Sequence, residues 1–339
     1  MNRFVRILQP GVVEVCQGVI PEPKPGEALL RMLYGGICGS DLNSYRGTSP
    51  YVTYPRIPGH EFSAEIVKVE ENSLGLAKGQ IVTANPYFNC GHCYSCKRGL
   101  VNCCMSNQTM GVQREGGFSQ YFTMPIDRIY SGNGLDPRVL ALIEPLCIGY
   151  HGVINASIQP DDHVLIVGAG TIGLLAAIVA QTLGGKVSIC DISQDKLDHA
   201  VKNGIKSGFL CDNSQQFIQT ANNLTNGNGF DVTIEAVGLP QTFQNCIDAA
   251  AFGGHVVLIG VGNDNLDFNF TVLQKKELKL MGSRNAMKQD FENAIALVKS
   301  GKIDLSGIQI TEYALDDAPQ AFHDLQAHAG QMNKVLIRF

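Results

Sequence analysis

The sequence contains no tryptophan, and charged residues make up only 17% of its 339 residues. Its 26 basic and 31 acidic residues give a formal net charge of -5, and neither sign is gathered into a run. Proteins that bind nucleic acid or anionic membranes usually carry a basic patch, so we expect neither partner. The N-terminal residues also lack the apolar core and small-residue cleavage site of a signal peptide, which predicts a cytoplasmic protein.

Long apolar runs are equally scarce. Residues 164–185 carry no charge over twenty-two positions, which is long enough for a transmembrane helix. Three glycines within the first ten of these residues divide the segment into a short strand, a tight turn and a helix. We therefore predict no membrane span.

The residues that are present predict a folded protein of about two domains. Apolar residues make up 45% of the chain, which is enough for a sizeable core. The first third contains short segments rich in β-branched and aromatic residues, separated by glycine and proline: EALLRMLY, FSAEIVKVE, QIVTANPY and FSQYFTMPI. A helix-like stretch at residues 137–155 ends this β-rich region.

From about residue 163 the pattern changes to alternating strands and helices. HVLIVG, KVSICD, FDVTIEAVG and GGHVVLIGV are typical of buried strands, and helix-like segments lie between them. This alternation predicts an α/β fold with a doubly wound parallel sheet that is covered on both faces. After residue 282 the strand-like segments QITEY and KVLIRF fit either the end of this sheet or a return to the first domain.

The turn after HVLIV has the pattern GxGxxG, formed by Gly168, Gly170 and Gly173. The first two glycines permit a tight turn close to a pyrophosphate, and the third allows close packing of helix on strand. The N-terminus of the following helix offers unpaired N–H groups to the phosphates. Asp191 ends the next strand, where a carboxylate accepts hydrogen bonds from ribose hydroxyls and repels a 2′-phosphate. Because no arginine follows Asp191 closely, we predict NAD rather than NADP; an ordinary glycine turn of an α/β protein is the alternative.

Eleven cysteines without an export signal predict metal-bound and free thiols rather than disulfides. Four of them follow the spacing C-x2-C-x2-C-x7-C: Cys90, Cys93, Cys96 and Cys104. Four thiolates in one short loop fit a closed structural zinc site, and an iron–sulfur cluster is the competing interpretation. The adjacent Cys103 is out of register with this pattern, and we expect His92 to be a solvated loop residue.

A sparser set of metal-binding residue types lies elsewhere. Cys38 lies in GGICGSD, His60 and Glu61 lie in PGHEF, and Glu144 lies in LIEPLCIGYH. A Cys/His/carboxylate set leaves a coordination position for water or substrate, as a catalytic zinc requires. Such a zinc would polarise an alcohol oxygen and favour the alkoxide from which a hydride departs. A buried cysteine, a core histidine and surface glutamates are the alternative interpretation.

Together these motifs resemble those of the zinc-dependent medium-chain alcohol dehydrogenases. GGICGSD, PGHEF, the four-cysteine segment, GGFSQY, the IEP segment and VGAGTIG occur in that family's order and approximate spacing. The resemblance implies a Rossmann doubly wound parallel sheet inserted into a GroES-like, partly open β-barrel catalytic domain. The implied divisions are residues 1–147 for the catalytic domain with a structural zinc lobe at 88–106, 148–284 for the NAD-binding domain, and 285–339 for the C-terminal part of the catalytic domain.

The resemblance also implies one catalytic and one structural zinc per chain. Cys38, His60 and Glu144 would surround the catalytic zinc, with Glu61 either a direct ligand or an exchanging one. Ser40 lies where the family has a hydroxyl that bonds the substrate oxygen and begins a proton relay. The expected catalytic residues are Ser40, Glu61 and Glu144. The residues expected to bind NAD are Gly168, Gly170, Thr171, Ile172, Gly173, Asp191, Val237 and Val261.

Many family members end this relay at a histidine, where the present chain has Asn43. Asparagine does not titrate near neutral pH, so we expect the relay to end in water or at another group.

Two longer segments resemble one group of enzymes within this family, and that resemblance implies a class of substrate. YRGTSPYVTYPRIPGHEF and KKELKLMGSRNA are similar to segments of bacterial dehydrogenases that oxidise C5 of hexonates, such as L-galactonate and L-gulonate. A hexonate carboxylate calls for a cation, and our candidates are Arg46 and Arg284. A surface or interdomain ion pair explains each arginine equally well.

Other functions remain open on the sequence. A polyol or polyol-phosphate dehydrogenase would share the fold and the mechanism. A non-enzymatic dinucleotide-binding protein would lack a metal ligand or the Ser40 hydroxyl, and a zinc-free quinone reductase would lack both cysteine sets. The resemblance also implies a homo-oligomer, either a dimer or a tetramer, that acts on a small molecule.

Overall fold

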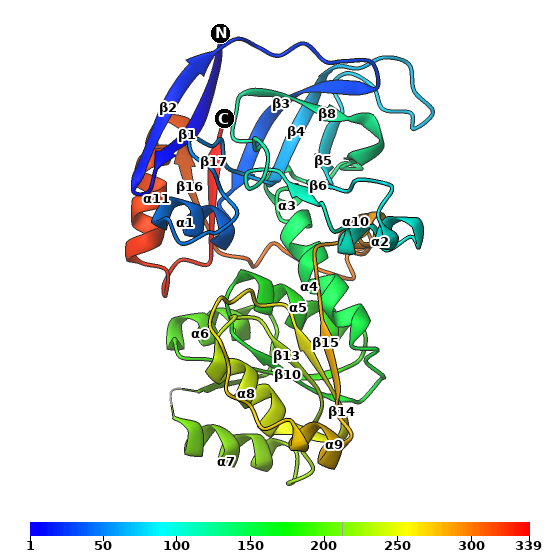
Figure 1. Ribbon diagram of the computed structural model, residues 1–339, viewed down its shortest axis with the longest axis vertical. Helices are drawn as coiled ribbons and strands as arrows, with labels where there is room; N and C mark the ends of the chain where they lie inside the picture. Colours follow the sequence, from blue (N-terminus) through cyan, green and yellow to red (C-terminus); the bar gives the residue numbers. More distant parts are fainter. Residues whose placement is uncertain (212) are drawn as a thin grey trace. The chain divides into compact units, whose positions relative to one another are not determined.

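The computed structural model describes residues 1–211 and 213–339, and their contacts divide the chain into two units (Figure 1). The mixed-sheet unit comprises Met1–Glu144, Ala286–Lys299 and Gln309–Phe339. The parallel-sheet unit comprises Pro145–Asn285 and Ser300–Ile308. Each unit is therefore assembled from segments that are separated in the sequence.

Residues 300–308 differ from the predicted division, which placed them in the C-terminal part of the catalytic domain. Their apolar side chains are buried: Ile303, Leu305 and Ile308 are 1%, 2% and 6% exposed. Nδ2 of Asn203 also donates a hydrogen bond to the carbonyl of Gly307 at 3.2 Å. The segment belongs to the parallel-sheet unit because its apolar residues pack there.

The mixed-sheet unit consists mainly of strands joined by loops and short helices. Its strands are β1 (Asn2–Gln9), β2 (Val12–Gly18), β3 (Glu27–Gly36), β4 (Glu61–Lys68), β5 (Ile81–Ala84), β6 (Tyr87–Phe88), β7 (Gln108–Thr109), β8 (Tyr121–Pro125), β9 (Ile129–Ser131), β16 (Ile310–Ala314) and β17 (Lys334–Arg338). Its helices are α1 (Gly39–Arg46), α2 (Tyr94–Lys97), η1 (Val101–Cys103), η2 (Ile126–Arg128), α3 (Pro137–Leu140), α10 (Lys288–Lys299), η3 (Leu315–Asp317) and α11 (Ala318–Ala327).

The main sheet of this unit has seven strands in the order β16-β17-β3-β4-β5-β9, with β8 also paired to β3. The pairs β1-β2 and β6-β7 form two further small sheets. Strand β17 runs antiparallel to β3, with Leu336 opposite Gly36. The C-terminal strands therefore return to the first part of the chain, which confirms the expectation drawn from the family resemblance.

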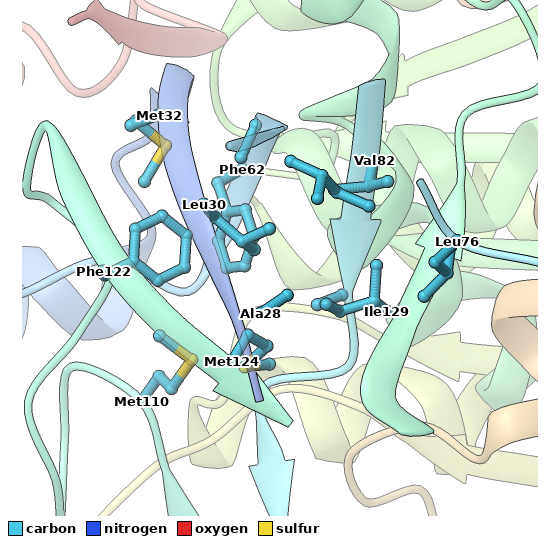
Figure 2. Packing of buried hydrophobic residues seen from close by; sticks show 13 residues of the cluster. Ala28, Leu30, Met32, Phe62, Leu76, Val82, Met110, Phe122, Met124 and Ile129 are labelled. Carbon is cyan, nitrogen blue, oxygen red and sulfur yellow. The ribbon is translucent and has the colours of Figure 1, made fainter. Parts of the chain in front are cut away.

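Alternation along the strands produces the core of this sheet (Figure 2). Ala28, Leu30 and Met32 are two residues apart on β3, so their side chains point to the same face. Phe62 on β4 and Phe122 on β8 meet there edge to face, with ring centroids 5.1 Å apart. Side chains that alternate along a strand therefore divide into two faces, and those on one face of β3 form part of the core.

The stretch predicted as one helix over residues 137–155 forms two helices, α3 and α4 (Ile143–Asn155). Pro145 explains the division. In a continuous helix it would remove the hydrogen bond to residue 141 and clash with the preceding turn, whereas in the first turn of α4 its missing N–H is harmless.

The parallel-sheet unit alternates strands with helices. Its elements after α4 are β10 (His163–Val167), α5 (Thr171–Thr182), β11 (Lys186–Asp191), α6 (Gln194–Lys202), β12 (Ser207–Leu210), α7 (Ser214–Leu224), β13 (Phe230–Glu235), α8 (Pro240–Ala249), β14 (Ala250–Leu258), α9 (Thr271–Lys276) and β15 (Lys279–Gly282).

The six strands of this unit are all parallel, in the order β12-β11-β10-β13-β14-β15. The strand order reverses between β10 and β13, which is where doubly wound sheets bind their ligands. The predicted α/β class and doubly wound sheet are thereby confirmed. Within the ranges that the structure describes, no helix has the length and hydropathy to span a membrane.

Helix α10 joins the mixed-sheet unit through Phe291, which is fully buried and stacks on Tyr130 with ring centroids 5.0 Å apart. We expect Phe291→Ala to lower the free energy of unfolding by about 3–5 kcal/mol, because it leaves a cavity in a packed core. Urea unfolding followed by circular dichroism measures this change. Phe252→Ala is the matched control, since Phe252 is 69% exposed; equal effects of the two substitutions would contradict the assignment of α10.

Candidate functional site

The four-cysteine segment forms a compact lobe between β6 and β7 that includes α2 and η1. The sulfur atoms of Cys90, Cys93, Cys96 and Cys104 all lie within 4.8 Å of one another. Cys103 is outside this set, as its register predicts. His92 is exposed, and its Nδ1 lies 2.8 Å from the carbonyl of Cys90. The structure therefore brings together the four predicted ligands and not their neighbours.

Backbone groups in this lobe stabilise negative charge on sulfur. The N–H of Cys90 donates to Sγ of Cys104 at 3.2 Å, and the N–H of Cys93 donates to Sγ of Cys90 at 3.4 Å. Backbone N–H groups of Cys96 and Met105 lower the pKa of the Cys93 thiol to about 6. Burial and the neighbouring Cys93 raise the pKa of the Cys96 thiol to about 11, so the lobe does not favour the thiolate at every cysteine. Four cysteine sulfurs this close together nevertheless fit a closed tetrahedral zinc site.

The second set of ligands lies where two loops meet. Cys38 is the N-cap residue of α1, and His60 and Glu61 lie at the start of β4. One ligand atom from each lies within 4.8 Å of the others. Asp41, which is fully buried, accepts hydrogen bonds from the N–H of Cys38 and of Gly59, each at 3.0 Å. Asp41 therefore ties together the loops that carry the ligands.

The acidic groups around His60 shift the pKa of its imidazole. Burial lowers the pKa of the imidazole, but Cys38, Asp41 and Glu144 outweigh it and raise that pKa well above its ordinary value. Within the described residues, Nδ1 of His60 is buried without a hydrogen-bond partner. A site that favours positive charge fits a divalent cation bound by Cys38, His60 and a carboxylate.

Lys334 completes this centre, and the sequence analysis missed it. Its ammonium donates to the carboxylate of Glu61 and lies 3.4 Å from the carbonyl of Ile37. Lys334 and Glu61 are only 3% and 2% exposed. Any side chain on Gly36 would clash with the pair, since its Cβ would lie 2.5 Å from Oε2 of Glu61. The only local signal was a lysine at the first position of β17, directly before three apolar residues.

Glu144 lies beside this centre, in the first turn of α4. Its carboxylate accepts a hydrogen bond from the hydroxyl of Tyr87, and burial raises its pKa to about 7. Glu144 is not in the set whose ligand atoms lie within 4.8 Å, whereas Glu61 is. Of the two carboxylates predicted as ligands, the structure thus groups Glu61 with Cys38 and His60.

The hydroxyl of Ser40 is buried in the first turn of α1, two residues after Cys38. In the part of the chain that the structure describes, Oγ has no hydrogen-bond partner. Asn43 lies one turn further along the helix and is exposed. A buried hydroxyl without a partner next to a metal ligand fits a group that bonds substrate.

The GxGxxG turn connects β10 to α5 as predicted. Gly168 has φ +102°, and a Cβ on Gly173 would lie 1.8 Å from the carbonyl oxygen of Gly168. Gly170 is the N-cap of α5, whose first turn contains Thr171 and Ile172. The turn therefore requires glycine at its first and last positions, and it presents a helix N-terminus of the kind that binds phosphates.

Asp191 supports this turn from the end of β11. Its Oδ2 accepts a hydrogen bond from the N–H of Ala169 at 2.7 Å, and its Oδ1 accepts one from the N–H of Ser193 at 2.9 Å. A carboxylate at this position fits the ribose-binding acid predicted from the sequence.

The remaining predicted residues are exposed. Val237 and Val261 follow β13 and β14 and are 42% and 84% exposed. Arg46 lies in the last turn of α1 in the mixed-sheet unit, and Arg284 follows β15 in the parallel-sheet unit.

Comparisons with known proteins agree with this arrangement. Residues 24–132 match the family described as the alcohol dehydrogenase GroES-like domain, and residues 171–300 match the zinc-binding dehydrogenases. L-galactonate-5-dehydrogenase of Escherichia coli (strain K12) is 37% identical over 295 residues, covering 87% of this chain and 86% of the relative.

Solved structures are similar over the full length. A zinc-binding dehydrogenase of Sinorhizobium meliloti 1021 bound to NADP is 30% identical with a TM-score of 0.92, covering 100% of this chain and 99% of that one. Galactitol-1-phosphate dehydrogenase from Escherichia coli is 30% identical with a TM-score of 0.90, covering 99% and 100% of the two chains.

The cysteine lobe can be tested by removing one ligand. If the lobe holds a structural zinc, we expect Cys96→Ala to lose one equivalent of zinc and to lower the melting temperature by roughly 5 °C, because a bound metal would stabilise the lobe. Metal analysis and thermal unfolding measure the two effects. Cys103→Ala is the control, since that cysteine is outside the set and should keep both values. Loss of zinc with an unchanged melting temperature would show that the lobe is not structural.

The buried ion pair predicts a large effect on stability. Lys334→Met leaves the Glu61 carboxylate buried without its counter-charge, and we expect the free energy of unfolding to fall by about 3–5 kcal/mol. Adding Glu61→Gln should restore part of this loss. Lys68→Met removes the exposed ion pair with Glu22 (3.0 Å) and should cost at most about 1 kcal/mol. Denaturant unfolding that gives equal values for Lys334→Met and Lys68→Met would contradict the pairing.

Proposed function

This chain belongs to the zinc-type alcohol dehydrogenase family, and we propose that it reversibly oxidises the C5 hydroxyl of a hexonate to the keto acid, with NAD as the hydride acceptor. The observation that carries the reaction type is the close set of half-buried Cys38 with buried His60 and Glu61, beside the hydroxyl of Ser40, which has no partner among the described residues. The substrate class is supported by the 37% identity to an L-galactonate-5-dehydrogenase.

Cys38 and His60 would hold the catalytic zinc, with a carboxylate from Glu61 or Glu144. When bound, zinc acts as a Lewis acid that lowers the pKa of a coordinated alcohol. The carboxylate of Asp41 faces His60, with Oδ1 4.0 Å from Nδ1. It also accepts hydrogen bonds from the backbone N–H groups of Cys38 and Gly59, which fixes both ligand-bearing loops. The Lys334 ammonium offsets the charge of Glu61, so that two glutamates can be buried beside Cys38.

Ser40 would receive the proton that leaves the alcohol. Its hydroxyl can accept a hydrogen bond from the substrate, because nothing in the described part of the chain occupies it. Asn43, the exposed side chain one turn away, does not titrate near neutral pH, so the proton would pass to water or to another group. The four-cysteine lobe would hold a second zinc with a purely structural role, since its four thiolates leave no open coordination position.

Asp191 supports NAD rather than NADP, because its buried carboxylate would repel a 2′-phosphate. A structural relative was nevertheless solved with NADP, so the two cofactors should be compared directly. Arg46 and Arg284 stay our candidates for the hexonate carboxylate. Polyol-phosphate oxidation is the second candidate function, supported by the likeness to galactitol-1-phosphate dehydrogenase.

The deciding experiment is NADH formation by the zinc-loaded protein across a panel of hexonates, neutral polyols and polyol phosphates, repeated with NADP. We expect specific turnover of a hexonate with NAD. Turnover of polyols or their phosphates alone would contradict the substrate class and leave the mechanism intact.

Cys38→Ala tests the mechanism. We expect it to abolish turnover and to change the dissociation constant for NADH by less than about twofold, because the metal ligand and the pyrophosphate turn are in different units. Cys16→Ala, a cysteine of β2 outside both metal sets, is the matched control and should keep full activity. Full turnover by Cys38→Ala would contradict a zinc mechanism at this site.

A further inference from the structure

Strand β13 ends in a buried carboxylate that has no part in the chemistry described above. Glu235 is 2% exposed. Its Oε1 accepts hydrogen bonds from the N–H of Val237 at 2.9 Å, from the N–H of Gly238 at 2.8 Å, and from the hydroxyl of Thr242 at 2.6 Å. Among the residues described, no basic side chain lies within ion-pair distance of it, so its charge is balanced by these three donors.

The same residue also holds the next turn of the sheet. The backbone carbonyl of Glu235 accepts hydrogen bonds from the N–H groups of Ile259 at 2.9 Å and Gly260 at 3.1 Å. The carboxylate of Glu235 also lies against this second turn, because a Cβ on Gly260 would lie 2.3 Å from Oε2 of Glu235. Glu235 therefore fixes both the turn at residues 236–239, after β13, and the turn at residues 259–262, after β14.

The two turns also pack directly on each other. A Cβ on Gly262 would lie 2.0 Å from the carbonyl oxygen of Gly238, and a Cβ on Gly238 would lie 2.5 Å from the carbonyl oxygen of Val261. No side chain fits between them, so a shift of the first turn displaces the second.

The strand order indicates which half of a dinucleotide these turns face. Asp191 ends β11, on one side of the GxGxxG turn that follows β10, and β13 and β14 lie on the other side. A dinucleotide lies across this edge, with the adenosine ribose at the acid and the pyrophosphate at the glycine turn. The nicotinamide half would then extend over the turns after β13 and β14, where Val237 and Val261 are exposed.

We propose that Glu235 is a positioning residue for the nicotinamide ring of the cofactor: its carboxylate fixes the turn after β13 and, through the packing of the two turns, the turn after β14, so that Val237 and Val261 are presented to the ring. This inference rests on the proposed use of a nicotinamide dinucleotide. Glu235 is buried beneath the turns and acts through them, without touching the cofactor.

The test compares two ligands that differ by the nicotinamide ring. ADP-ribose contains the adenosine, the pyrophosphate and one further ribose but lacks the nicotinamide ring, whereas NADH contains both halves. Isothermal titration of the zinc-loaded, full-length protein gives both dissociation constants. We expect Glu235→Ala to raise the dissociation constant for NADH about tenfold, which is about 1.4 kcal/mol, and that for ADP-ribose by less than about twofold.

Two milder variants keep the proposal testable if Glu235→Ala does not fold. Glu235→Gln preserves the size of the side chain and one acceptor oxygen, and Thr242→Val removes one of the three donors. Both should shift NADH affinity in the same direction by roughly threefold, with melting temperatures recorded alongside. Asp231→Asn is the matched control: it lies at the opposite end of β13, accepts the N–H of His163 at 2.8 Å, and should change neither ligand's affinity.

Selective loss of NADH affinity in the Glu235 and Thr242 variants supports the proposal. Equal weakening of NADH and ADP-ribose would overturn it, because Glu235 would then support the whole edge of the sheet. Unchanged affinity for both ligands would overturn it as well. Failure of the unaltered protein to bind either NADH or NADPH would instead contradict the proposed function.

Discussion

The ion pair between Lys334 and Glu61 is the interaction on which the candidate catalytic centre depends. It joins two residues 273 positions apart in the sequence, and both are buried. The pair forms only when β17 is aligned against β3, where Gly36 leaves space for it. Because Glu61 lies with Cys38 and His60, the C-terminal strand must be in place before the metal ligands have their final electrostatic environment.

The chain buries several carboxylates, and they are not all compensated in the same way. Glu61 has a lysine, whereas Asp41, Asp191 and Glu235 accept hydrogen bonds from backbone N–H groups. Burial raises the pKa of Glu144 to about 7, although the charge of His60, the hydrogen bond from the Tyr87 hydroxyl and the charge of Lys334 each lower it. Backbone donors fix loops in position, while a counter-charge allows a carboxylate to remain ionised beside a metal. We therefore assign a structural role to the carboxylates held by backbone N–H groups, and a role in the reaction to those that lie beside a counter-charge.

Much of the site could be predicted because its residues are close in sequence. The glycine turn, the cysteine spacing and the PGHEF segment each place their functional groups within one loop. Lys334 and Glu235 could not be found in this way. The role of Lys334 depends on a strand pairing between distant segments, and Glu235 acts through turns after two different strands. Likewise the segment 300–308 and the break at Pro145 follow from tertiary packing and backbone sterics, which the periodicity of side chains does not encode.

X-ray absorption at the zinc edge of the purified protein tests the central claim, that one unit of this chain holds two chemically different zinc sites. Four cysteines at one site and Cys38 with His60 and oxygen ligands at the other predict an average of about 2.5 sulfur atoms per zinc, at about 2.3 Å, together with a nitrogen and oxygen shell near 2.0–2.1 Å. An average of about four sulfurs per zinc would mean that only the cysteine lobe binds metal. That result would contradict the assignment of Cys38, His60 and the neighbouring glutamates as a catalytic zinc centre.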